Sequence, residues 1–212
     1  MPEVSKDQLP LVQDAAEHWP VTASVQLAQG SLVRLRSDTV RFPDGGTADR
    51  EVVEHPGAVA VVALNESGEV LLIRQYRHPV GQLLWEIPAG LRDVAGEPAQ
   101  ITAERELLEE TGYRATDWQQ LLEVFSSPGF STERITIFLA RGLTQVPGHD
   151  QQYVREHEEA SIVPAWILLE QAVATVLAGE LHNGVAAVGI LSAYAARDGA
   201  LAAPPRADGP GR

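Results

Sequence analysis

The alternation of apolar and polar side chains predicts strands in the first half of the chain. Residues 31–42, SLVRLRSDTVRF, alternate in this way, and the glycine-rich PDGG at 43–46 predicts a turn after them. Residues 50–55 then predict the returning strand of a hairpin. The continuous apolar run GAVAVVAL at 57–64 predicts a strand buried on both faces, and 70–77 predicts the next strand.

The second half of the chain mixes strand and helix patterns. Strands are expected at 121–125 and 134–140, and a polar loop at 148–163 is expected to end in another strand. Two apolar-rich helices are expected at about 164–178 and 183–196. Strands interspersed with helices predict a mixed α/β domain.

The chain is expected to divide into three parts. Residues 1–55 form a loose N-terminal segment with a hairpin lobe, 56–199 form the main domain, and 200–212 form a disordered tail rich in Pro, Gly and Ala. The opening MPEVSKDQLP lacks the basic and apolar stretches of a signal peptide. No window approaches the roughly 20 apolar residues of a membrane span. We therefore expect a cytoplasmic protein.

Composition and charge narrow the function classes. The 212 residues carry 16 Lys and Arg against 29 Asp and Glu, a formal net charge of -13. An acidic surface repels phosphate backbones, which argues against nucleic-acid binding, and an anionic substrate would need a cation in its site. The absence of cysteine excludes disulfides, thiolate zinc sites and cysteine nucleophiles.

One predicted helix carries a concentration of glutamate. Pro98 suits its first turn and Gly112 suits its end, with good helix formers between them. Glu109 and Glu110 follow Glu106 by three and four residues, so all three lie on one helix face. Such a face is either a solvated charged surface or a site for a hard cation such as Mg²⁺ or Mn²⁺. The spacing alone leaves both interpretations open.

The stretch from Gly90 to Tyr113 resembles the Nudix box, G-x5-E-x7-R-E-U-x-E-E-x-G-U, in which U is a bulky apolar residue. Glu97, seven further residues, and the run that begins at Arg105 follow the second part of the box position by position. Two features depart from it. Six residues rather than five separate Gly90 from Glu97, which alters the backbone path near Gly90, and Tyr113 replaces an aliphatic residue.

Flanking segments resemble the ADP-ribose pyrophosphatase branch of this superfamily. They are REVVEHPGAVAVVAL, QYRHPVGQLLWEIPAGL and SSPGFSTE, and Pro128 stands downstream of the box where this branch carries proline. The resemblance implies an α/β/α sandwich with a mixed sheet and a small N-terminal β-lobe, and commonly a homodimer. It also implies hydrolysis of ADP-ribose to AMP and ribose 5-phosphate.

The resemblance further implies a divalent ion, Mg²⁺ or Mn²⁺, bound beside the glutamate helix. The expected ligands are the carboxylates of Glu106, Glu109 and Glu110 and the backbone carbonyl of Ala89. Glu106 and Glu110 are therefore expected to be catalytic as well. Glu97 and Arg105 are expected to fix the orientation of these carboxylates.

In this branch, a glutamate on a distant loop supplies the general base. The acidic stretch REHEEAS occupies the matching place, and alignment with the family pattern favours Glu159 over Glu158. From its residues alone, this stretch is better interpreted as a solvated loop, and only the resemblance favours a general base. The expected substrate-binding residues are Arg50 and Arg77, whose guanidinium groups match phosphate oxygens, and Glu86 and Glu133 near the ribose. Each arginine alone is equally expected as an ordinary strand-end residue, and Glu86 as an ion-paired carboxylate.

Several alternatives stay open at this point. The substrate is either ADP-ribose or another nucleotide sugar or dinucleotide, because the box reports pyrophosphate chemistry while loops set specificity. A non-catalytic nucleotide sensor is a second alternative, although such proteins usually lose box glutamates and this chain retains all four. A partner-binding domain with a merely acidic helix is the third.

Overall fold

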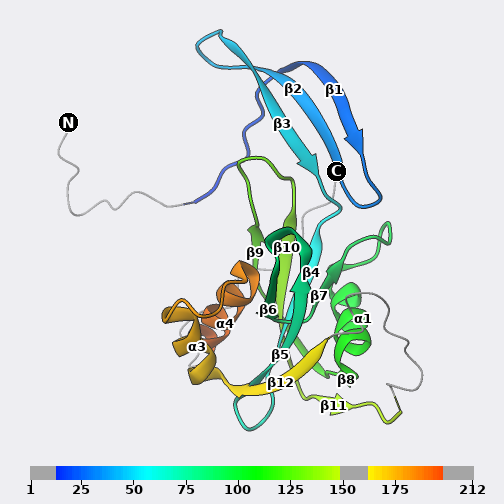
Figure 1. The fold of residues 1–212 in the computed structure, drawn as a ribbon, viewed down its shortest axis with the longest axis vertical. Helices are drawn as coiled ribbons and strands as arrows, with labels where there is room; N and C mark the ends of the chain where they lie inside the picture. The colour runs from blue at the N-terminus through cyan, green and yellow to red at the C-terminus, as the bar shows by residue number, and fades with distance from the viewer. Residues whose placement is uncertain (1–12, 149–161, 198–212) are drawn as a thin grey trace, which may run out of the picture.

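The computed structural model describes residues 13–148 and 162–197 of the chain. Its N-terminal part is an antiparallel three-stranded sheet in the order β1-β2-β3, which stands apart from the rest of the molecule (Figure 1). The strands are β1 (Val21–Gln29), β2 (Arg34–Arg41) and β3 (Thr47–Glu54). The structure contains the predicted hairpin, and β1 is an additional strand that is exposed along its whole length.

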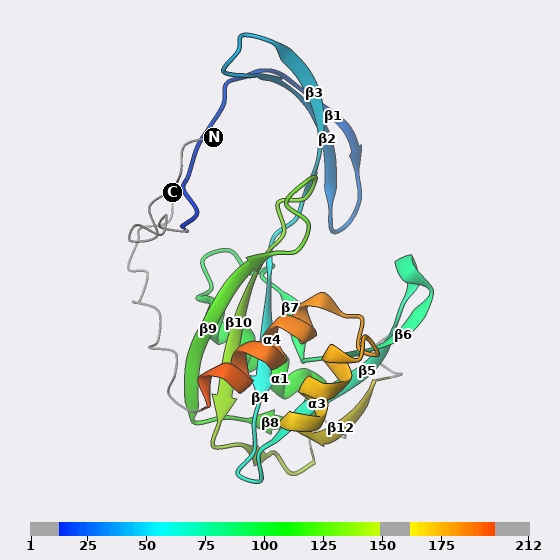
Figure 2. The same ribbon diagram turned by 90° about the vertical axis from the view of Figure 1, so that its left-hand side faces the viewer.

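The loop between β9 (Asp117–Phe125) and β10 (Arg134–Arg141) contacts this lobe. It rises to the end of β3, as Figure 2 shows. The Val53 amide donates to the Phe130 carbonyl at 2.8 Å, and the Thr132 amide donates to the Val53 carbonyl at 3.0 Å. The end of β3 is therefore fixed to the main domain by backbone hydrogen bonds.

The central sheet has four strands in the order β7-β4-β10-β9. Its strands are β4 (Ala58–Ala63), β7 (Ala89–Leu91), β9 (Asp117–Phe125) and β10 (Arg134–Arg141). β4 and β10 are parallel, and the other neighbours are antiparallel. Every residue of β4 is buried, which confirms the strand with two buried faces that the apolar run at 57–64 predicts.

A second sheet has the order β12-β5-β6. Its strands are β5 (Glu69–Arg77), β6 (Gln82–Glu86) and β12 (Val163–Leu168). The predicted helix start at 164 is therefore wrong. Residues 164–168 pair with β5 instead, with Trp166 opposite Leu71, and this long-range pairing overrides the local helical pattern. The remaining short elements are the 3-10 helix η1 (His78–Val80) and a two-stranded sheet of β8 (Tyr113–Arg114) and β11 (Thr144–Gln145).

Helices cover both sides of the sheets (Figure 1). They are α1 (Ala99–Thr111), α3 (Leu169–Leu177) and α4 (Gly184–Ala196). Val59 and Val61 of β4 pack against α1 through Leu107, whereas Ala60 and Val62 pack on the side of α3 and α4. The arrangement confirms the expected α/β fold. Within the described ranges, no helix is long and apolar enough to cross a membrane.

Helix α1 begins and ends close to the residues that the sequence marks. Pro98 is its N-cap, and Gly112 follows its last turn with a φ of 74°. The Gly112 amide donates to the Leu108 carbonyl, which closes the helix with the left-handed conformation that glycine adopts without strain. The glutamates of the box therefore lie on a helix with fixed ends.

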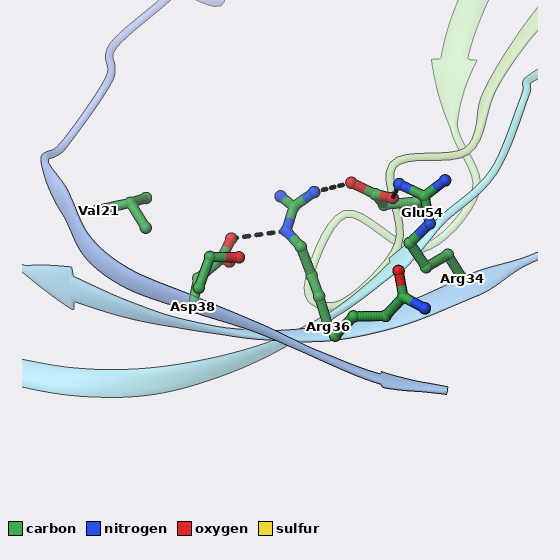
Figure 3. A pocket seen from close by; sticks show the side chains of 7 residues that line it. Val21, Arg34, Arg36, Asp38 and Glu54 are labelled. Carbon is green, nitrogen blue, oxygen red and sulfur yellow. Dashed lines mark hydrogen bonds and ion pairs between the residues drawn. The ribbon is translucent and has the colours of Figure 1, made fainter. Parts of the chain in front are cut away.

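A charged network holds one face of the N-terminal lobe together. Figure 3 shows Arg36 pointing between Asp38 and Glu54, and Nε of Arg36 lies 2.8 Å from Asp38. Glu54 also contacts Arg34 at 3.1 Å. Asp38 is buried, and its hydrogen bond from Ser24 is the main reason that its pKa is lowered, with Arg36 adding to the effect against burial. The network ties β2 to the end of β3.

Candidate functional site

Two glutamates of α1 reach the edge strand β7 at neighbouring residues. Glu110 is 7% exposed, and its Oε2 accepts a 2.9 Å hydrogen bond from the Ala89 amide. The carboxylate of Glu106 lies directly over Gly90. The four-residue spacing predicts a shared face, and the structure places both side chains against the same strand.

Gly90 is required at this point by space rather than by backbone conformation. A Cβ atom built on Gly90 would lie well inside van der Waals distance of all three carboxyl atoms of Glu106. Any other residue here would therefore displace the Glu106 carboxylate. The missing side chain of Gly90, the first glycine of the box, thus leaves the space that the Glu106 carboxylate occupies.

Arg105 lies among the carboxylates of the box. Its guanidinium contacts Glu106 at 2.6 Å, Glu109 at 3.3 Å, Asp93 at 3.6 Å and Glu97 at 3.7 Å. Nη2 of Arg105 is buried and makes no hydrogen bond within the described chain. As the side chains stand, no three His, Asp or Glu residues in the described ranges form a group ready to hold a metal ion. Arg105 therefore supplies one positive charge among four carboxylates.

Burial raises the pKa of Glu106 to about 7, although Arg105 beside it acts in the opposite direction. Glu109 and Asp93 add to the increase by charge repulsion. A carboxylate in this environment favours any change that brings a further positive charge. A bound cation would therefore stabilise this site more than it would stabilise a solvated acidic helix face.

The raised pKa predicts a specific dependence of stability on pH. Between its ordinary value of 4.5 and about 7, Glu106 keeps its proton in the folded chain but loses it in the unfolded chain. The contribution of Glu106 to the free energy of unfolding of the metal-free protein is therefore expected to fall as the pH rises through this window. Urea unfolding of wild type and Glu106→Gln in EDTA measures the effect. Identical pH dependence of the two proteins would contradict the assignment.

A cavity of about 510 Å³ adjoins this part of β7. Ala89 and Gly90 form part of its wall, so the glutamates of α1 meet β7 at the cavity's edge. Three of the four predicted substrate-binding residues line the same cavity: Arg77, Glu86 and Glu133. The structure therefore brings together residues that are far apart in the sequence.

Arg77 and Glu86 form a two-point ion pair in this cavity. Nε and Nη2 of Arg77 lie 2.8 and 2.6 Å from the two oxygens of Glu86. Glu86 is 2% exposed and is also within 3.5 Å of the Gln75 amide nitrogen. This pair fixes the plane of a guanidinium that is half exposed at the cavity.

Beside Glu133, the cavity is lined by side chains to which the sequence assigns no role: His55, Ser126 and Asn183. Glu133 accepts a hydrogen bond from Ser126 and lies 3.6 Å from Nδ1 of His55. Asn183 caps α4 by accepting from the Ala186 amide at 2.9 Å, and it also lines the cavity. An Asn before a predicted helix signals a cap, but no sequence pattern places His55 beside Glu133.

Among the four predicted substrate-binding residues, Arg50 does not line this cavity. Arg50 lies on β3 in the N-terminal lobe, where its guanidinium packs 5.1 Å from the centre of the Phe42 ring and donates to the Asp49 carbonyl. Glu159, like Glu158, lies outside the described residues, as does the predicted disordered tail at 200–212. The base and the role of Arg50 stay predictions.

Known proteins similar to this chain have the same kind of box and fold. The family model for the NUDIX domain matches residues 54–187. The ADP-ribose pyrophosphatase of Mycobacterium tuberculosis is 45% identical over 185 residues, which cover 87% of each chain. That of Bacillus subtilis is 34% identical over 168 residues, 79% of this chain and 88% of the relative. A crystal structure of an ADP compounds hydrolase matches with a TM-score of 0.72 at 19% identity, covering 89% of this chain and 100% of the other, and supports the fold alone.

Proposed function

The chain belongs to the NUDIX family, and from this premise we propose that it hydrolyses the pyrophosphate bond of ADP-ribose to give AMP and ribose 5-phosphate. One observation carries the proposal: Glu106 and Glu110 meet β7 at the wall of a cavity that also holds the Arg77–Glu86 pair. The similarity to two ADP-ribose pyrophosphatases over most of the chain supports ADP-ribose as the substrate.

The residues beside β7 fit a divalent ion such as Mg²⁺ or Mn²⁺. They offer hard oxygen donors, and the partly buried Glu106 carboxylate has a raised pKa that a cation would lower again. We assign the binding to Glu106, Glu109, Glu110 and the Ala89 carbonyl, with Glu97 and Arg105 orienting the carboxylates. When bound, the ion neutralises the pyrophosphate, polarises its P–O bonds and lowers the pKa of a bound water. Glu106 and Glu109 would turn from Arg105 toward it.

The chain's own residues bind and orient the substrate in this proposal. Arg77, held in plane by Glu86, donates hydrogen bonds to phosphate oxygens at the cavity. Glu133, held by Ser126, accepts a hydrogen bond from a ribose hydroxyl. Glu159 accepts the proton of the attacking water as general base.

A nucleotide panel tests the proposed function. The purified chain is incubated with ADP-ribose, NADH or GDP-mannose in the presence of Mg²⁺, Mn²⁺ or EDTA, and AMP or GMP is measured by chromatography. We expect the highest kcat/KM for ADP-ribose, with AMP as product and no turnover in EDTA. Faster turnover of GDP-mannose would show that ADP-ribose is not the preferred substrate. An absence of any nucleotide product would favour a non-catalytic sensor.

We also propose that the N-terminal lobe, within residues 1–55, joins two copies of the chain. β1 is an edge strand whose residues are all exposed, and Val21, Val25 and Leu27 are each more than half exposed. A three-stranded sheet with an open apolar edge gains stability by covering it.

Light scattering coupled to size-exclusion chromatography measures this assembly. We expect a homodimer for wild type and a monomer for the double variant Val25→Glu, Leu27→Glu. Leu177→Glu, which changes an exposed leucine on α3, is the matched control and is expected to stay dimeric. A monomeric wild type would contradict the proposal.

A further inference from the structure

A second cavity, of about 680 Å³, lies at the end of the central sheet next to the N-terminal lobe. None of the residues assigned to catalysis or substrate binding lines it. Two arginines, a histidine and a phenylalanine stand out in its lining: Arg92, Arg134, His55 and Phe125. In a chain with a net charge of -13, such a concentration of cationic side chains is unusual.

Strand register places the two arginines on either side of a glycine. Arg92 follows β7, and its amide donates to the Gly57 carbonyl at 3.1 Å. On the other side of Gly57, β10 begins with Arg134, whose carbonyl lies 3.1 Å from the position of a Cβ on Gly57. The two arginine backbones are thus two strand spacings apart, roughly 10 Å. Gly57 adds no side chain to the space between the two arginine backbones.

The second cavity and the candidate active site are lined by neighbouring sets of paired residues across β7, β4 and β10. Leu91, Ala58 and Ile135 form the row next to the arginines, and all three line the active-site cavity. Successive residues of a strand point to opposite faces, so the side chains of this row and those of the arginine row lie on opposite faces of the sheet. His55 is the side chain at the boundary of the two cavities, because it lines both.

The donors in the second cavity are incompletely used. Nε of Arg92 is buried and has no hydrogen-bond partner in the described chain. Arg134 has one carboxylate contact, Glu123 at 3.5 Å, and both of these side chains are more than a third exposed. A buried donor without a partner costs free energy that a bound anion would recover. The arrangement therefore favours an anion between the two arginines.

His55 and Phe125 narrow the chemistry of that anion. Nδ1 of His55 accepts the Gly57 amide at 3.1 Å, so in the neutral ring Nε2 carries the proton and donates. Two guanidinium groups and one imidazole N–H match the three terminal oxygens of a phosphate monoester. Phe125 is 52% exposed, and the Arg134 guanidinium packs over its ring at 5.2 Å from the centre, which places an aromatic side chain beside the cationic group.

We propose that this second cavity binds the phosphate group of a phosphate monoester, between Arg92 and Arg134. The site does not depend on the proposed function. If that function holds, both products are phosphate monoesters, and the shared His55 would link occupancy of this cavity to the active site. The proposed ligand group is the phosphate itself. Titration with a nucleotide, a sugar phosphate and inorganic phosphate distinguishes the source of that group.

Calorimetric titration in EDTA tests the site without turnover. Inorganic phosphate, ribose 5-phosphate and AMP are titrated into wild type, Arg92→Gln and Arg134→Gln. Each substitution is expected to weaken binding about tenfold or more, since a charge-assisted hydrogen bond contributes on this scale. Arg92→Lys keeps the positive charge and loses the two-point hydrogen bonding of the guanidinium. Its affinity for phosphate is expected to lie between those of wild type and Arg92→Gln. Arg114→Gln, which removes an equal charge from the exposed end of β8, should bind like wild type.

Arg77→Gln separates this site from the active-site cavity. Arg77→Gln is expected to keep the phosphate binding that Arg92→Gln and Arg134→Gln weaken, whereas loss of binding in Arg77→Gln with retention in both Arg92→Gln and Arg134→Gln would overturn the proposal. Wild type that binds none of the three probes would also overturn it. Tighter binding of AMP than of ribose 5-phosphate, abolished by Phe125→Leu, would identify a nucleotide as the preferred ligand, and equal binding of all three would identify the phosphate group alone. Unfolding midpoints of every variant are measured beside the titrations.

Discussion

Replacing either Glu106 or Glu110 by Gln is expected to lower kcat for ADP-ribose by roughly 10²–10³ or more, the cost of removing one preorganised charge from a reacting centre. Both carboxylates meet β7 at the wall of the active-site cavity. Gln preserves the size of each side chain and removes its charge, so the loss reports on charge rather than on packing. Steady-state kcat and KM at saturating Mg²⁺ measure it.

Glu104→Gln is the matched control for these two substitutions. Glu104 lies on the same helix, at a variable position of the box, and accepts a hydrogen bond from Gln100 at the surface. We expect this variant to keep the wild-type kcat. Gln at 110 still accepts from the Ala89 amide through its side-chain oxygen, so its unfolding midpoint should stay near wild type. A loss of less than about tenfold in both box variants would argue against direct metal binding.

Local patterns predict the elements whose environment is uniform along their length. The continuous apolar run of β4 predicts a strand that is buried on both faces. Gly112 predicts the end of α1. Residues 164–168 behave differently, because their pairing with β5, nearly a hundred positions earlier, decides their conformation. β1 alternates apolar and polar residues as a strand should, but the described chain provides no layer to bury its apolar side.

The same distinction applies to the candidate site. The helical spacing of Glu106 and Glu110 predicts a shared face, and the structure contains one. The proximity of Arg77 to Glu86 and of His55 to Glu133 depends on how β5, β6 and the β9–β10 loop meet in space. The second cavity is an even clearer case, since it exists because strand register aligns two arginines around Gly57. Such contacts carry no periodic signal in a single sequence.

Gly90→Ala is expected to lower kcat at least about a hundredfold, because a methyl group at this position displaces the Glu106 carboxylate, and a shift of about 1 Å in a catalytic group can have that effect. Gly90 has no unusual backbone conformation in β7, so the effect arises from the methyl group alone. Kinetics with ADP-ribose and the free energy of unfolding are measured together. Gly30→Ala, in a turn whose added Cβ meets one backbone oxygen at 3.4 Å, is the control and should change neither.

A double variant separates this steric mechanism from a general disturbance of β7. Glu106→Ala removes the atoms that the new methyl group would overlap, so adding Gly90→Ala to it should cost no further activity and little further stability. The two substitutions would then be strongly non-additive, as expected for residues that act through one contact. Additive losses in kcat and in the free energy of unfolding would show that Gly90 matters for another reason, and that the carboxylate of Glu106 does not depend on the absent side chain beneath it.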